Sequence, residues 1–144
     1  CEVAAYLLAS TAPWTWVEVL TPYVEMKAQI QLGLRRLVRG GLEEELRQRV
    51  RVSTIHSALG SEADIVVVAM GKEYILDEET MYFRIPELIN VQFSRHRRLL
   101  VIIGDVERLA RGFKQVGHAK NLPRLAEALN ELKEQEFVVR ANVG

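Results

Sequence analysis

Residues 89–105 read Ile-Asn-Val-Gln-Phe-Ser-Arg-His-Arg-Arg-Leu-Leu-Val-Ile-Ile-Gly-Asp, and this stretch decides the fold. It predicts a short helix, a cluster of cations at 95–98, and then a strand over 99–103. An apolar run without charges is typical of a strand buried on both faces of a sheet. Cations at the edge of such a sheet are costly unless an anion meets them, and the planar guanidinium suits phosphate. The cluster therefore indicates either an anion site or a solvated loop that anchors the sheet edge.

The composition limits the possible classes of function. The chain has 144 residues, and its 19 Lys and Arg balance its 19 Asp and Glu, so no global positive field attracts nucleic acid. The only cysteine is Cys1, and the three histidines have no cysteine at ligand spacing, so we expect no metal site. No apolar run is long enough to span a membrane, and no signal peptide is visible. We expect an intracellular protein without a membrane partner, and a piece of a larger one because it does not begin with Met.

Strands alternate with amphipathic helices along the rest of the chain. Apolar runs predict further strands over 16–20, 51–55 and 65–70. Thr21 as N-cap and Pro22 at the first helical position predict a helix that ends at Gly40. Apolar periodicity predicts other helices over 2–10, 86–94, 106–111 and from Asn121 onward. This alternation predicts an α/β fold with a mostly parallel sheet covered by helices on both faces.

Two more stretches accompany residues 89–97 and complete a set of three motifs. Residues 17–23 read Val-Glu-Val-Leu-Thr-Pro-Tyr, a strand that ends in Thr-Pro-Tyr. Residues 52–64 read Val-Ser-Thr-Ile-His-Ser-Ala-Leu-Gly-Ser-Glu-Ala-Asp and lead into an Ile-Val-Val-Val strand. In this order the three stretches resemble the second RecA-like motor domain of superfamily 1 helicases, in the branch of the nonsense-mediated-decay and senataxin-type enzymes. The second stretch looks like motif V of that family, and residues 89–97 look like motif VI.

The resemblance implies a fold, an activity and partners. The fold is a RecA-like three-layer domain over residues 1–112, with a C-terminal helical extension over 113–144. The function is that of the C-terminal motor domain of an ATP-dependent DNA or RNA helicase, which works on single-stranded nucleic acid. The chain contains no Gly-x-x-x-x-Gly-Lys-Ser/Thr motif, so ATP with Mg²⁺ is expected to be held mainly by an N-terminal RecA-like domain of the same protein. The isolated fragment is expected to be inactive.

The resemblance also assigns the nucleotide-binding residues. Arg95 is implied to be the arginine finger that stabilises charge on the γ-phosphate, and Arg97 to support it. Glu62 is implied to accept a hydrogen bond from the nucleotide sugar, and Gly60 to permit close approach of the backbone.

The residues alone leave plainer roles open for the same positions. Arg97 and Arg98 pair with acids such as Asp105 or Glu107 in that reading, and Glu62 starts a helix.

A second group is implied to contact the nucleic acid. It comprises Thr21, Tyr23, Thr54 and His56, which lie where the family touches the nucleic-acid backbone with hydroxyls and main-chain N–H groups. The structural alternatives are that both threonines cap strand ends, and that His56 orients a loop or lies in the core.

Leu59 departs from the family pattern. It stands where the family has Gln or Lys, a polar residue that connects the nucleotide site to the strand-binding surface. Leucine can neither donate nor accept a hydrogen bond, which favours a second function, a catalytically degenerate RecA-like module that binds nucleic acid or protein. A third possibility is an unrelated parallel α/β fold that binds another phosphorylated ligand at residues 95–98.

Overall fold

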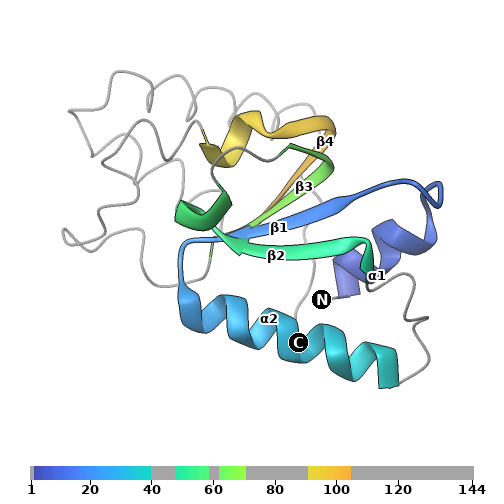
Figure 1. Cartoon of the computed structure of the whole chain (residues 1–144), viewed down its shortest axis with the longest axis horizontal. Coiled ribbons are helices and arrows are strands. Elements are labelled where there is room, and N and C mark those ends of the chain that lie inside the picture. Colours follow the sequence, from blue (N-terminus) through green and yellow to red (C-terminus); the bar gives the residue numbers. More distant parts are fainter. Residues whose placement is uncertain (1, 40–47, 59–61, 71–90, 105–144) are drawn as a thin grey trace. The chain divides into compact units, whose positions relative to one another are not determined.

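The computed structural model describes residues 2–39, 48–58, 62–70 and 91–104. Its elements in chain order are α1 (Glu2–Ala9), β1 (Val17–Thr21), α2 (Val24–Arg39), β2 (Val50–Thr54), the 3₁₀ helix η1 (His56–Ala58), β3 (Ala63–Ala69) and β4 (His96–Ile103) (Figure 1). Residues 91–94 are also helical. The chain forms two compact units, and all these elements belong to the unit of residues 1–71 and 87–103. The helices expected over 106–111 and from Asn121, and the boundary at 112, lie outside the described residues.

The four strands form one parallel sheet in the order β2-β1-β3-β4. The two central strands are the apolar ones: β1 is buried at every position, and the side chains of Val66, Val67 and Val68 in β3 are at most 2% exposed. Parallel neighbours require crossover connections, and α2 provides the crossover from β1 to β2. The predicted α/β, RecA-like fold is confirmed, and the strands β1 to β3 lie within two residues of their predicted ranges.

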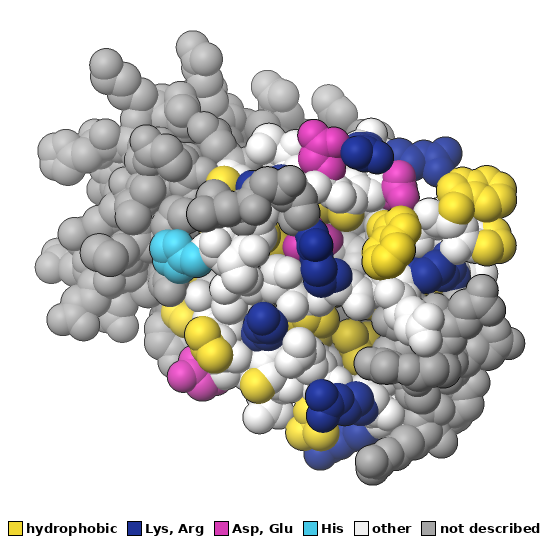
Figure 2. Space-filling view, viewed as in Figure 1, with side chains coloured by type: hydrophobic (Ala, Val, Ile, Leu, Met, Phe, Trp, Pro, Cys, Tyr) yellow, Lys and Arg dark blue, Asp and Glu magenta, His cyan; other side chains and the backbone are white. Residues whose placement is uncertain are grey.

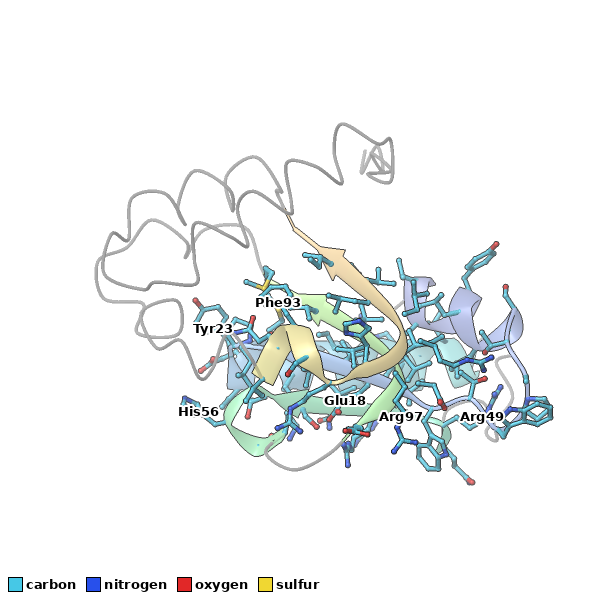
Figure 3. All side chains as sticks on the ribbon, turned by 90° about the horizontal axis from the view of Figure 1, so that it is seen from above. Glu18, Tyr23, Arg49, His56, Phe93 and Arg97 are labelled. Carbon is cyan, nitrogen blue, oxygen red and sulfur yellow. The ribbon has the colours of Figure 1, made fainter. Side chains whose placement is uncertain are left out.

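Helices cover the sheet on both faces. Figure 1 shows α1 and α2 on one side, where Leu8 and Leu34 pack against Val17, Val19 and Ile65. Figures 1 and 3 agree that the helical residues 91–94, which include the labelled Phe93, lie over the opposite face. Because side chains alternate along a strand, Glu18 faces away from α1 and α2 when Val17 and Val19 face them.

The helix after β1 begins later than predicted. Thr21 is the last residue of β1 and pairs with Thr54 of β2, so it is not the N-cap of a helix that starts at Pro22. α2 begins at Val24, and the first helical hydrogen bond runs from the Lys27 N–H to the Tyr23 carbonyl at 3.0 Å. The prediction was wrong because pairing with β2 keeps Thr21 in the sheet, whatever its capping propensity.

β4 differs most from the prediction. It begins at His96, so His96, Arg97 and Arg98 belong to the strand and do not precede it. It is also not buried on both faces, because Leu99 is 42% exposed and Ile103 is 41% exposed. In the described sheet β4 has only β3 as a neighbour. An edge strand accommodates charged side chains, because the backbone pairing does not depend on them.

Candidate functional site

Parallel pairing of β3 and β4 joins two of the predicted nucleotide-binding residues. Because the strands are parallel, their amino ends lie side by side, and we call this side of the sheet the amino edge. The amino edge carries the charged and aromatic residues Trp16, Glu18, Glu62, Arg95 and Arg97. Glu62 directly precedes β3, and Arg97 is the second residue of β4. Arg97 Nε donates a hydrogen bond to Glu62 Oε2 at 2.9 Å, across 35 positions of sequence. These two side chains therefore form an ion pair at the start of the strands.

A β-bulge shapes β4 at this point. Ala63 pairs with His96 and Ile65 pairs with Leu99, so two steps along β3 match three along β4. The extra residue breaks the alternation of side chains and increases the local twist. Arg97 and Arg98 are consequently both exposed, although consecutive residues of a regular strand point to opposite faces.

Arg95 lies at the same edge. Its carbonyl oxygen accepts a hydrogen bond from the Ala63 N–H at 3.2 Å, which holds the residue beside the start of β3. Its side chain is half-buried, whereas Arg97 and Glu62 are 64% and 63% exposed. Glu62 leads into a strand, so the alternative that it starts a helix is wrong. Arg97 does pair with an acid, but that acid is Glu62; Asp105, Glu107 and Gly60 lie outside the described residues.

Glu18 is a charged residue that sequence reasoning missed. It is the second residue of β1 and is only 1% exposed. Arg51, its neighbour in the β1–β2 register, contacts Glu18 Oε1 with Nε at 3.0 Å and with a terminal guanidinium nitrogen at 2.9 Å. A buried carboxylate requires such a partner. The sequence did contain a signal for this buried charge, because Glu18 is the one acid within the otherwise apolar run of residues 16–20.

Trp16 is the second residue that sequence reasoning missed. Its backbone N–H donates to Asp64 Oδ2 at 3.0 Å, and its carbonyl accepts from the Ile65 N–H at 3.1 Å. The residue is nevertheless 55% exposed. Figure 2 shows exposed hydrophobic side chains beside Lys, Arg, Asp and Glu side chains on the visible face. The backbone of a largely exposed tryptophan is thus bonded to the start of β3.

The predicted nucleic-acid-binding residues gather at the carboxyl ends of β1 and β2. The Ile55 N–H donates to the Thr21 carbonyl at 3.1 Å and joins the two strand ends. Thr21 is fully buried, and its hydroxyl donates to Met26 Sδ at 2.8 Å. Its side chain therefore faces inward. Tyr23, which follows this strand end, is half-buried.

Thr54 and Ser57 form a local hydrogen-bonded turn at the end of β2. The Thr54 N–H donates to Ser57 Oγ at 3.0 Å, and the Ser57 hydroxyl donates to the Thr54 carbonyl at 3.0 Å. The Ser57 N–H donates to Thr54 Oγ1 at 3.4 Å, which is a capping contact for η1. His56 lies in this turn and is exposed, so the alternative of a core histidine is wrong.

The described site residues therefore form two groups at opposite ends of the strands. Figure 3 places Tyr23 and His56 at one end and Arg97 at the other. Within the described ranges no three His, Cys, Asp or Glu side chains come together as a metal site, so Glu18, Glu62 and Asp64 do not form one. None of the helices described is both long and apolar enough to cross a membrane.

One comparison with known proteins gives a match that covers most of the chain. A family model described as "AAA domain" matches residues 1–107, which contain both ends of the sheet and every described element. Among curated proteins no sequence matches the chain. The chain belongs to this AAA domain family, and the family is one of helicase-type C-terminal domains.

Proposed function

We propose that the chain is the C-terminal motor domain of an ATP-dependent superfamily 1 helicase that acts on DNA or RNA, and that Arg95 is its arginine finger. The family supports a helicase-type ATPase. The observation that carries the finer proposal is the amino edge: Arg95 lies beside the start of β3, and Glu62 and Arg97 meet there at 2.9 Å. Residues of two distant motifs thus converge where the resemblance puts a nucleotide.

The Arg97–Glu62 ion pair is compatible with nucleotide binding. Both side chains are about two-thirds exposed, and an exposed ion pair contributes only about 0–1 kcal/mol to stability. A phosphate oxygen that replaces Glu62 as the partner of Arg97 gives a charge-assisted bond of the same kind. Glu62 is then available to accept a hydrogen bond from a sugar hydroxyl. Exchanging this ion pair for a contact with a ligand therefore costs little.

The triphosphate and its Mg²⁺ require a second domain. The sequence has no phosphate-binding glycine loop, and the described carboxylates do not form a metal site. The described cations fit the stabilisation of charge during phosphoryl transfer rather than the binding of Mg²⁺. Arg95 can stabilise negative charge on a phosphoryl group held by an N-terminal RecA-like domain.

The carboxyl ends of β1 and β2 are the proposed track for single-stranded nucleic acid. His56 is exposed and Tyr23 and Thr54 are half-buried there. Thr21 is completely buried, and its carbonyl already accepts the Ile55 N–H, so the contacts proposed at this end come from His56, Tyr23 and Thr54. Because this end lies opposite the amino edge (Figure 3), the two ligands would occupy separate sides of the domain.

The test is Arg95→Ala in the complete protein that carries this chain. A finger contacts the nucleotide more strongly in the transition state than in the ground state, so kcat should fall by about two to five orders of magnitude while nucleotide affinity changes little. ATP turnover with nucleic acid present measures kcat, and a thermal melt of each variant measures stability. Arg98→Ala is the matched control, and we expect less than about a tenfold change in turnover.

Turnover of Arg95→Ala at the parent rate would contradict the assignment. A lowered melting temperature with unchanged specific activity of the folded fraction would show that Arg95 is structural.

The degenerate binding module remains the second candidate because Leu59 stands where the family has a polar residue. Parent protein that binds single strands but does not hydrolyse ATP would favour it.

A further inference from the structure

Helix α2 has an outer face that points away from the sheet. Its inner face carries Ile30 and Leu34, which pack in the hydrophobic core. Residues two positions away lie about 200° around a helix, so Ala28 and Leu32 point outward. Ala28 is exposed, Leu32 is 41% exposed, and Val24, one turn before Ala28, is 69% exposed. These three apolar side chains follow one another at every fourth residue, and we call them the outer row of α2.

Charges of opposite sign lie at the two ends of the outer row. Glu25 is exposed in the first turn and is the one acid of α2, whereas Arg35 and Arg36 are exposed toward its end. Within the described part of the chain none of these three side chains forms an ion pair. Figure 2, viewed as Figure 1, shows an acidic side chain near the start of α2, then hydrophobic side chains, and Lys or Arg side chains toward its end.

The outer row is complementary to itself when two copies of α2 run antiparallel. Ala28 and Leu32 each lie two positions from Ile30. A two-fold axis level with Ile30 therefore puts Leu32 of one copy against Ala28 of the other. A large side chain then packs on a small one on each side of the axis, which is the arrangement that fills a helix contact well.

The charges favour the same antiparallel arrangement. Glu25 lies five positions before Ile30 and Arg35 five positions after it, so Glu25 of one copy is level with Arg35 of the other, beside Arg36. A parallel pair would instead bring like charges together at both ends, which is unfavourable. A uniformly acidic partner, such as a nucleic acid, suits the two arginines but repels Glu25. The fitting partner has one acidic and one basic end, and a second copy of α2 offers both.

We propose that the outer row of α2 is a self-association surface through which two copies of this chain form a two-fold dimer. The inference is independent of the proposed function. Residues 24–36 span about 20 Å of helix, and a contact along one helix buries less than the roughly 1,200 Å² of a standard interface. We therefore expect a weak dimer, with a dissociation constant between about 1 μM and 1 mM, and a monomer in dilute solution.

The test is sedimentation equilibrium of the complete protein that carries this chain, from micromolar to millimolar concentration. Leu32→Ala removes the central apolar contact twice per dimer and keeps a strong helix former, so the dissociation constant should rise about tenfold or more. Glu25→Lys creates like charges at both ends of the contact, and so does the double change Arg35→Glu with Arg36→Glu. Each should weaken the dimer about 5-fold to 50-fold.

A mixture of these two charge variants is the most specific measurement. One variant carries cations at both ends of the outer row and the other carries acids at both ends, so each repels itself and attracts the other. The mixture should associate to within about threefold of the parent dissociation constant, although each variant alone is weakened. Arg98→Glu reverses an exposed cation on β4 and is the control, which should leave the dissociation constant unchanged. Thermal melts check that each variant is folded.

A parent protein that stays monomeric at about 1 mM would overturn the proposal. A dimer that is insensitive to Leu32→Ala and to the charge variants would also overturn it, because its interface then lies elsewhere. The same holds for a mixture that associates no better than its components. If the Arg35 and Arg36 changes weaken binding of a single-stranded oligonucleotide while no variant alters sedimentation, the cations serve nucleic acid and the self-association surface is wrong. None of these outcomes depends on the turnover of Arg95→Ala.

Discussion

Gln92 is completely buried, and neither its amide nitrogen nor its amide oxygen has a hydrogen-bond partner among the described residues. A buried polar group left unpaired costs about 1–3 kcal/mol. Gln92→Met keeps the length of the side chain and removes the amide, so we expect the free energy of unfolding to rise by about 1–3 kcal/mol. Denaturant unfolding measures it. The control is Gln29→Met on the exposed face of α2, which should change stability by less than about 0.5 kcal/mol. A loss of stability in Gln92→Met would show that the amide does have a partner.

At the scale of elements, Arg49 joins α1, the following loop and β2. Its guanidinium bonds the Leu8 and Ala12 carbonyls, and a cation suits the negative end of a helix. Hydrogen bonds to a charged group contribute about 1.5–3 kcal/mol, so Arg49→Met should destabilise the domain by about that amount. Hydrogen exchange should quicken first at the amides of residues 8–15. Arg36→Met, an exposed cation on α2, serves as the control and should stay within about 0.5 kcal/mol of the parent. Equal effects of the two changes would mean that the Arg49 contacts stabilise nothing.

At the scale of the whole molecule, the proposed function gives the chain one side of a nucleotide site. It has neutral formal charge and no phosphate-binding glycine loop. We therefore expect the purified 144-residue chain to show negligible ATPase and weak binding to single strands, because few phosphates are neutralised. Steady-state ATPase and a salt titration of oligonucleotide binding measure both, with the complete protein as the reference. Turnover by the chain alone, at the same rate after a further purification step, would refute the need for a second domain.

Local physics made the parallel α/β fold predictable from the sequence. Each of these elements is predicted by a short, local pattern: the Ile-Val-Val-Val run, the Thr-Pro break after β1, and the periodic apolar residues of α2. Each element appears close to its predicted place. The motif pattern also named Glu62, Arg95 and Arg97 as nucleotide-site residues; the structure brings Glu62 and Arg97 together, and their role toward a nucleotide stays a prediction. The errors lie at element ends and in β4, where a charged stretch joined the sheet because its backbone pairs with β3.

The sequence by itself determined which residues carry charge, which segments are strands, and that the strands run parallel under helices. Only the tertiary structure decided the order β2-β1-β3-β4, and with it every contact across strands. Arg97 meets Glu62 because β4 pairs with β3, Glu18 finds Arg51 because β2 pairs with β1, and Trp16 reaches Asp64 because β1 lies beside β3. Strand pairing joins residues far apart in the chain through backbone groups that every residue shares, so no local pattern of side chains encodes it.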